Sequence, residues 1–262
     1  MIISKSNAKV KNIIALQSKG KVRKEQKVYV VEGLKMFTEL SREKIEEIYV
    51  TEEFAKKQAA ALMEFEYQVV DERVFAQMSD TKTPQGILCV VKQPEYQRED
   101  LISKKKPLLM VLEDLQDPGN VGTIFRTAEG AGVTGIILSE SCVDVYNPKT
   151  IRATMGSIFR VPFLYVDDII KLCDELKGQQ IKTYAAHLSG ENMYTQEDYT
   201  DGCAFFIGNE GKGLSDKVVQ QIERLIKIPM EGKVESLNAA IAATILMYEG
   251  HRQRGNDKGA TT

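Results

Sequence analysis

The sequence predicts an α/β protein with two domains, and three observations carry that prediction. Segments with the pattern of strands alternate with segments with the pattern of helices along nearly the whole chain of 262 residues. Several strand segments are continuously apolar, such as PLLMVL at residues 107–112, which is typical of parallel strands covered on both faces. A polar stretch at residues 96–106, ending in three lysines, interrupts the alternation and indicates a linker.

Residues 1–95 form the first predicted domain, a small α/β unit of ordinary size. A helix is expected at residues 6–19, because Val10, Ile13 and Leu16 recur at helical spacing with lysines opposite them. The alternation then predicts strands at residues 28–31, 45–50, 68–70 and 86–91, and helices at residues 33–41, 53–65 and 74–78.

Residues 107–255 form the second predicted domain. Strands are expected at residues 107–112, 135–139, 161–166, 182–186, 204–207 and 226–228, and helices at residues 121–130, 148–159, 168–176, 216–225 and from residue 236 onward. Ligands of parallel sheets bind beyond the carboxyl ends of the strands, so the loops that follow these strands are the first place to seek a site. The polar tail at residues 256–262 is expected to be disordered.

The composition excludes several classes of protein. The formal net charge is −2, so the chain as a whole is not a generic binder of polyanions. Four cysteines without a CxxC pair lie in or beside apolar runs, which predicts small core residues in a reducing cytoplasm and neither a zinc site nor a disulfide framework. We expect no metal site. The chain shows no signal peptide and no apolar run long enough to span a bilayer, so we expect no membrane association.

The first thirty residues are the one strongly basic region, with eight lysines and arginines against one acid. A basic patch on an otherwise neutral chain indicates a local nucleic-acid face. The alternative is an ordinary solvated helix surface. The candidate RNA contacts are Lys5, Lys9, Lys11, Lys21 and Arg23.

The C-terminal stretch at residues 226–249 carries the strongest signal for a site. A short apolar strand ends at Pro229, a polar loop follows, and a helix apolar on nearly every face is expected to begin at Ser236. Such a helix must be buried, either in a core or against another subunit. Ser236 is the expected N-cap, and the exposed amides of a first helical turn make a natural ligand site.

Two glycine patterns have different interpretations. Gly130, Gly132 and Gly135 have dinucleotide spacing, but they follow a helix and precede a strand, so we predict a helix C-cap and a turn. GNEGKGLS at residues 208–215 instead follows the apolar strand 204–207. Bare glycines there favour close approach of a ligand to the backbone, with a tight turn as the alternative.

Arg126 is the unusual residue of the expected helix 121–130. Gly122, Thr123 and Gly130 are its helical neighbours and leave space over its guanidinium. The alternative is an exposed salt bridge to Glu129, which would contribute little. Arginine is also the usual residue for holding a phosphate or a developing oxyanion.

Three of these stretches resemble the motifs of the SpoU (TrmH-like) branch of the SPOUT RNA methyltransferases. They are, in the family's order, DPGNVGTIFRTA at residues 117–128, IGNEGKGL at residues 207–214 and IPMEGKVESLNAA at residues 228–240. The first domain is similar to the L30e-like substrate-binding domain often fused to this fold. One departure is SLNAA, with Ala239 and Ala240, where the family commonly has SLNVS.

The resemblance implies a specific fold and activity. The catalytic domain would be an α/β SPOUT fold with a C-terminal trefoil knot, acting as a homodimer through the knot region. It would methylate a ribose 2′-hydroxyl of RNA from S-adenosylmethionine, with ribosomal RNA favoured over transfer RNA. A non-catalytic RNA-binding protein that keeps the fold is the remaining alternative.

The resemblance also implies roles for individual residues. The implied cofactor-binding residues are Gly208, Glu210, Gly211, Ile228, Met230, Ser236, Leu237 and Asn238. The implied catalytic residues are Asn120, Arg126, Glu210, Ser236 and Asn238. Family proposals make Arg126 a base, but a guanidinium keeps its proton, so we expect it to stabilise charge.

Overall fold

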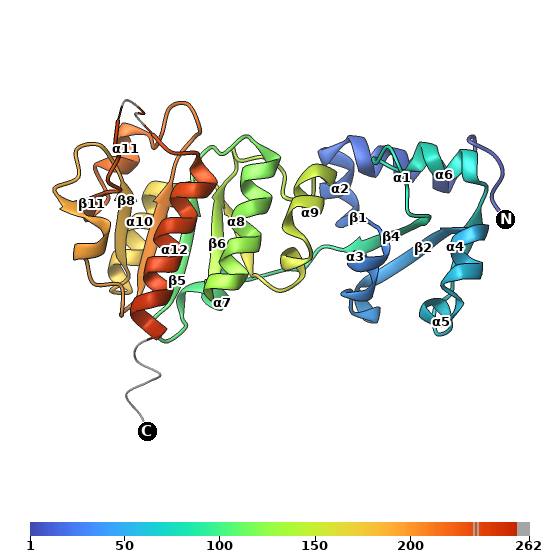
Figure 1. The fold of residues 1–262 in the computed structure, drawn as a ribbon, viewed down its shortest axis with the longest axis horizontal. Coiled ribbons are helices and arrows are strands. Elements are labelled where there is room, and N and C mark those ends of the chain that lie inside the picture. Colours follow the sequence, from blue (N-terminus) through green and yellow to red (C-terminus); the bar gives the residue numbers. More distant parts are fainter. Residues whose placement is uncertain (233, 235, 256–262) are drawn as a thin grey trace, which may run out of the picture. The chain divides into compact units, whose positions relative to one another are not determined.

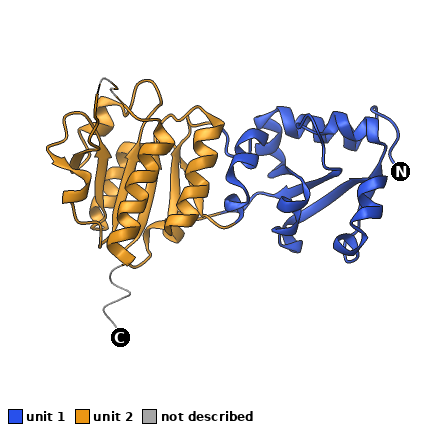
Figure 2. Cartoon of the chain, in the orientation of Figure 1, with its two compact units in different colours: residues 1–95, 144–159 blue, residues 96–143, 160–262 orange. Residues whose placement is uncertain are grey.

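The computed structural model describes residues 1–232, 234 and 236–255. It divides into two compact units, one of residues 1–95 and 144–159 and the other of residues 96–143 and 160 onward (Figure 2). Both units combine helices with a sheet, so the predicted α/β class is confirmed. The tail at residues 256–262, predicted to be disordered, lies outside the described residues.

The first unit contains a four-stranded mixed sheet in the order β1-β4-β2-β3 (Figure 1). Its strands are β1 (Val28–Glu32), β2 (Ile45–Thr51), β3 (Gln68–Val70) and β4 (Ile87–Lys92). Its helices before β4 are α1 (Ala8–Ser18), α2 (Gly20–Gln26), α3 (Leu34–Thr38), α4 (Glu52–Lys57), α5 (Ala59–Leu62) and α6 (Glu72–Met78). Helices α1 and α6 bury their apolar residues in one core with the strands, as the helical spacing of Val10, Ile13 and Leu16 predicts.

Residues 144–159 pack with the first unit, although the sequence pattern places them in the second domain. Helix α9 (Pro148–Thr154) lies against β1, and the ring of Tyr146 lies 4.6 Å from that of Tyr29. The local pattern of a helix does not say which core will bury it, so this assignment needed the tertiary structure.

Two expected helices and the expected linker differ from the structure. The helix predicted at residues 53–65 is two short helices, α4 and α5, separated at Gln58. The helix predicted at residues 216–225 ends early as α11 (Asp216–Val219), because its last residues join strand β11 (Arg224–Lys227). The segment predicted as a linker carries α7 (Arg98–Ile102), and Leu101 and Ile102 are buried in the core of the second unit.

The second unit contains a seven-stranded sheet in the order β7-β6-β5-β10-β8-β11-β9, with every pair parallel. Its strands before β11 are β5 (Leu108–Leu112), β6 (Gly135–Ser139), β7 (Phe163–Val166), β8 (Lys182–Ala186), β9 (Asn192–Met193) and β10 (Cys203–Ile207). Its long helices are α8 (Pro118–Ala131), α10 (Ile169–Gly178) and α12 (Ala239–Gly255). Since Leu112 of β5 pairs with Ile207 of β10, the loops after these two strands begin side by side.

Helix α12 packs against α8 and β10 and is buried along one side only. Ala239, Ala243 and Leu246 are buried, whereas Ile241 and Tyr248 are 50% and 47% exposed. The core of the single chain therefore buries one side of this helix, and burial of the other side against a second subunit stays a prediction. The trefoil knot implied by the resemblance stays a prediction.

The four cysteines are buried and unpaired, as predicted. Burial raises the pKa of Cys89 to about 12 and that of Cys203 to about 11, so both remain protonated thiols near neutral pH. Gly132, at φ +70°, is the left-handed C-cap of α8, which confirms the interpretation of the first glycine pattern. No helix among the described residues is long and apolar enough to cross a membrane.

Candidate functional site

Glu210 joins the loop after β10 to the loop after β5. Its carboxylate accepts hydrogen bonds from the main-chain nitrogens of Gln116 and Asp117, at 3.2 and 3.0 Å. It also accepts one from Nδ2 of Asn120, at 3.1 Å. A carboxylate is thus held by the amides at the start of α8, where the helix dipole favours a negative charge.

These hydrogen bonds change the acidity of Glu210. Partial burial acts to raise its pKa, but the bonds from Asp117, Asn120 and Gln116 outweigh burial and hold the pKa below its ordinary value. The side chain is therefore ionised near neutral pH and acts as an anchor that only accepts hydrogen bonds.

Asn238 joins the third motif to the other two. Its Nδ2 donates to Oδ1 of Asn120 at 2.9 Å. Its own Oδ1 accepts from the main-chain nitrogens of Ala240 and Ile241, at 2.9 and 3.3 Å. Asn238 is therefore the N-cap of α12, and the prediction that Ser236 caps this helix is wrong. Asparagine and serine cap equally well, so residue type alone does not locate the first turn.

The glycine-rich loop after β10 closes on itself. Asn209 and Gly213 exchange main-chain hydrogen bonds of 3.0 and 2.9 Å, and Asn209 Nδ2 donates to the carbonyl of Asp114 at 2.8 Å. A Cβ added at Gly208 would lie 2.1 Å from the carbonyl carbon of Gly213. The tight-turn alternative thus explains Gly208 without a ligand. A Cβ on Gly211 would meet only Asn209 Oδ1 at 3.7 Å, so that position is open.

A cavity of about 540 Å³ opens at the carboxyl ends of β8 and β11. It is lined by Ala186, His187, Leu188, Met193, Lys227, Ile228, Pro229, Met230, Glu231, Ser236, Leu237 and Ala242. Its size and its mixture of apolar and polar side chains are those of a site for a small molecule. Four of the implied cofactor-binding residues line it: Ile228, Met230, Ser236 and Leu237.

The other four implied cofactor-binding residues are not part of the cavity lining. Gly208, Glu210 and Gly211 lie in the loop after β10, and Asn238 follows Leu237 directly. The hydrogen bonds of Glu210 and Asn120 connect these residues to the segment that lines the cavity. The structure therefore separates residues that line the cavity from residues that hold its loops in place.

His187 received no role from the sequence, yet it lines the cavity. It follows β8 directly, and its Nδ1 accepts from the main-chain nitrogen of Ser189 at 3.2 Å. The signal that would have identified it was its position at the carboxyl end of a parallel strand.

Arg126 lies on α8 and is exposed. It forms no hydrogen bond or ion pair with any residue that the structure describes, and Glu129 pairs with Arg160 instead. The salt-bridge alternative is therefore wrong. Arg126 lies six residues beyond Asn120, about 9 Å along the same helix. A free guanidinium on the helix that anchors Glu210 is available to an anionic ligand.

The candidate RNA contacts on the first unit divide into two groups. Arg23 is 4% exposed, donates to the carbonyl of Leu16 at 2.6 Å, and pairs with Asp144 at 2.6 Å. The prediction that Arg23 contacts RNA is wrong, because its charge is already satisfied inside the unit. The lysines remain exposed: Lys9 pairs with Glu47, Lys21 lies 3.8 Å from Glu25, and Lys5 and Lys11 lie in solvent.

The cavity fits the cofactor that the resemblance implies. S-adenosylmethionine combines an apolar purine face with a cationic sulfonium and a charged amino acid end. Leu188, Ile228 and Leu237 supply apolar walls, while Lys227 and Glu231 supply charges of both signs. Within the described ranges, no cluster of His, Cys, Asp and Glu is arranged to hold a metal ion.

Family models match most of the chain. Residues 107–248 match the SpoU rRNA Methylase family, and residues 7–89 match an MRM3-like substrate binding domain. Among curated proteins, the chain is 32% identical over 249 residues to the 23S rRNA (guanosine(2553)-2′-O)-methyltransferase RlmP of Bacillus subtilis, covering 94% of this chain and 97% of RlmP.

Solved structures agree with these matches. An AdoMet-bound rRNA methyltransferase from Sinorhizobium meliloti is 30% identical, with a TM-score of 0.83 over 96% of this chain and 97% of that one. The SpoU methyltransferase AviRb from Streptomyces viridochromogenes, in complex with AdoMet, is 25% identical, with a TM-score of 0.86 over 95% of this chain and 98% of that one. Sequence, site geometry and fold thus agree, and the chain belongs to the SpoU rRNA methylase family.

Proposed function

We propose that this protein is an S-adenosylmethionine-dependent methyltransferase that modifies a ribose 2′-hydroxyl in RNA, with ribosomal RNA as its substrate. The observation that carries the proposal is the hydrogen-bonded series Glu210–Asn120–Asn238, which joins all three motifs beside a cavity. The name of RlmP, which matches nearly full length, supports ribosomal RNA and the 2′-oxygen. A ribosomal RNA substrate supports the proposal that the protein acts in the cytoplasm.

The cofactor would be held by the cavity at the ends of β8 and β11. Ile228, Met230 and Leu237 supply apolar contacts, and Ser236 supplies a hydroxyl. When bound, S-adenosylmethionine supplies an electrophilic methyl group on its sulfonium. Glu210, Asn120 and Asn238 keep the surrounding loops in one arrangement, which lowers the ordering cost of binding.

Arg126 is the residue proposed to act on the nucleophile. A ribose hydroxyl is a poor acid, so its oxygen needs a positive charge nearby as its proton passes to solvent water. The guanidinium keeps its own proton and can hold the developing alkoxide, or the adjacent phosphate, by charge-assisted hydrogen bonds. No described carboxylate neutralises Arg126, which keeps its charge available.

A homodimer through α12 completes the proposal. Ile241 and Tyr248 project from α12 with about half of their surface exposed. A second copy of this chain would cover them, as the sequence predicts for a helix apolar on both sides. The exposed part of α8, with Arg126, lies beside α12 and would then border the interface.

Two measurements test the function. Isothermal titration calorimetry with S-adenosylmethionine should show micromolar or tighter binding. Transfer of tritiated methyl groups to ribosomal RNA and to transfer RNA should then label ribosomal RNA, and mapping of 2′-O-methyl positions should locate the nucleotide. Labelling of transfer RNA alone would change the substrate, while cofactor binding without any transfer would indicate a non-catalytic RNA-binding protein.

A further inference from the structure

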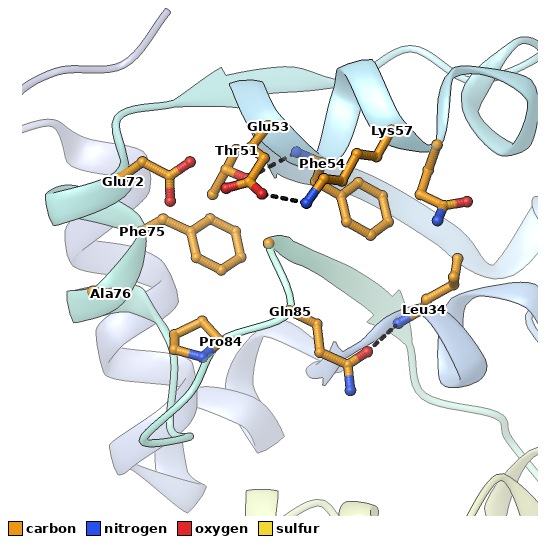
Figure 3. A pocket seen from close by; sticks show the side chains of 12 residues that line it. Leu34, Thr51, Glu53, Phe54, Lys57, Glu72, Phe75, Ala76, Pro84 and Gln85 are labelled. Carbon is orange, nitrogen blue, oxygen red and sulfur yellow. Dashed lines mark hydrogen bonds and ion pairs between the residues drawn. The ribbon is translucent and has the colours of Figure 1, made fainter.

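The first unit contains a recess that no part of the proposed reaction uses. It has a volume of about 360 Å³ and lies between α4, α6 and the segment that precedes β4 (Figure 3). Its lining includes Phe54 from α4, Phe75 and Ala76 from α6, and Pro84 and Gln85 from the segment before β4. In Figure 3 the rings of Phe54 and Phe75 project from different helices toward the same space.

Hydrogen bonds fix the walls of the recess in place. The main-chain nitrogen of Thr51 donates to the carbonyl of Gly86 at 2.9 Å, and Thr51 Oγ1 accepts from the nitrogen of Phe54 at 3.2 Å. Gly86 has φ +83°, and a Cβ there would lie 2.6 Å from Thr51 Oγ1. Gln85 Oε1 accepts from the nitrogen of Leu34 at 3.1 Å. The recess is therefore preformed and not a gap left by loose packing.

Glu32 fixes the other end of the same segment. Its Oε1 accepts from the hydroxyls of Ser79 and Thr81, at 2.6 and 2.8 Å. Residues 79–86 are thus tied to the end of β1 at one end and to Thr51 at the other. A segment held at both ends presents Pro84 and Gln85 in a fixed position.

The chemistry of the lining selects a flat, uncharged ligand. Phe54, Phe75 and Pro84 make the apolar part, and the two phenylalanine side chains, 7% and 1% exposed, form its floor. The charged side chains of the lining are Glu53, Glu72 and Lys57, and Lys57 already pairs with Glu53. A phosphate would meet more negative than positive charge there. A nucleobase has apolar faces and polar edges, and its edge can meet the carboxylate of Glu72 and the Nε2 of Gln85.

We propose that this recess takes one unpaired nucleobase of the RNA substrate. The inference rests on the proposed function, because it requires that RNA is the substrate. Proteins that read RNA by sequence target unstacked bases in loops and bulges, and they hold these bases against aromatic side chains. In the present domain, the lysines of α1 would contact phosphates, and the recess would supply the base contact.

The test fills the recess without removing any core residue. Ala76 is exposed and lines the recess, so Ala76→Trp places an indole in it. Ala60 on α5 is exposed and does not line the recess, so Ala60→Trp is the matched control. The chain contains no tryptophan, so the emission of the introduced indole, together with thermal unfolding, checks that each variant is folded.

The readout is the affinity for 23S rRNA transcribed in vitro, measured at several salt concentrations. A base held in a pocket contributes roughly 5- to 150-fold to affinity, so A76W should raise Kd about fivefold or more at every salt concentration, with an unchanged salt slope. A60W should bind like the wild type. The smaller Ala76→Leu should give an intermediate loss.

Three outcomes would overturn the inference. They are wild-type affinity in folded A76W, an equal loss in A60W, or a loss in A76W that comes from a lower salt slope, which would indicate phosphate contact. Failure of the proposed function would give a different result. In that case the wild-type protein itself would transfer no methyl group to RNA.

Discussion

Asn238 Nδ2 donates to Asn120 Oδ1 across 2.9 Å, although the two residues are 118 positions apart in the chain. The same Asn120 donates to Glu210, so one side chain connects the start of α8, the loop after β10 and the start of α12. Both of these side-chain hydrogen bonds join residues that are close in space and far apart in sequence. Their effect on the site can be separated from their effect on the fold.

Two substitutions at Asn238 should separate these effects. Asn238→Asp keeps the oxygen that caps α12 but loses the donor to Asn120, so thermal stability should stay near wild type while affinity for S-adenosylmethionine falls about tenfold. Asn238→Ala loses the cap as well and should cost about 1 kcal/mol of unfolding free energy. Thermal melts and calorimetry measure both. Wild-type cofactor affinity in N238D would show that the bond to Asn120 does not order the site.

Gly208 and Gly211 should respond differently to the same added methyl group. Gly208→Ala places Cβ 2.1 Å from the Gly213 carbonyl carbon, so the loop must move and cofactor affinity should fall by more than tenfold. Gly211→Ala meets nothing closer than 3.7 Å and should leave the loop in place. Calorimetry on both folded variants compares them. Similar losses would mean that Gly211 itself faces the ligand.

Arg126→Ala should strongly reduce methyl transfer while leaving affinity for S-adenosylmethionine within about twofold of wild type, because the side chain lines no part of the cavity. The loss of one oxyanion-stabilising group is expected to reduce turnover by about a hundredfold or more. Thr123→Ala, at an exposed position on the same helix, is the control. Unchanged turnover in R126A would remove this residue from the mechanism.

Arg23 and the exposed lysines should give opposite results. Arg23→Ala leaves Asp144 and two main-chain carbonyls without their donor, so it should lower the unfolding free energy by up to about 3 kcal/mol. Lys5→Glu and Lys11→Glu should leave stability nearly unchanged and should weaken RNA binding with a shallower salt slope. Chemical denaturation and salt-dependent binding measure these effects. An unchanged salt slope in the lysine variants would place the RNA face elsewhere.

The pKa of Glu210 lies below its ordinary value in the folded protein, which sets a direction for pH dependence. Its contribution to stability is present above the ordinary carboxyl pKa of about 4.3 and is lost as the pH falls through the lower folded value. Glu210→Gln should therefore be less stable at neutral pH and should lose less stability between about pH 5 and pH 3. Denaturation at several pH values measures this. Parallel curves for both proteins would contradict it.

The sequence reveals the site through local signals but misjudges which residues touch one another. The three motifs each follow a strand or open a helix, so their place at the carboxyl edge of the sheet is predictable. Arg23 belongs to a basic run and looks like an RNA contact, but Asp144, which satisfies it, is 121 positions away. His187 has no motif around it. Its position after the predicted strand 182–186 places it at the carboxyl edge of the sheet, and the cavity shows that it belongs to the lining.

The α/β class, the order of most strands and helices and the three motifs can be predicted from the sequence, because hydrophobic period and turn chemistry act between near neighbours. The tertiary structure decided which core buries residues 144–159, that Asn238 and not Ser236 caps α12, and that Arg23 is neutralised while Arg126 is free of a described partner. The physical reason is that burial and hydrogen bonding depend on residues brought together from distant parts of the chain, and one-dimensional patterns carry little information about such pairs.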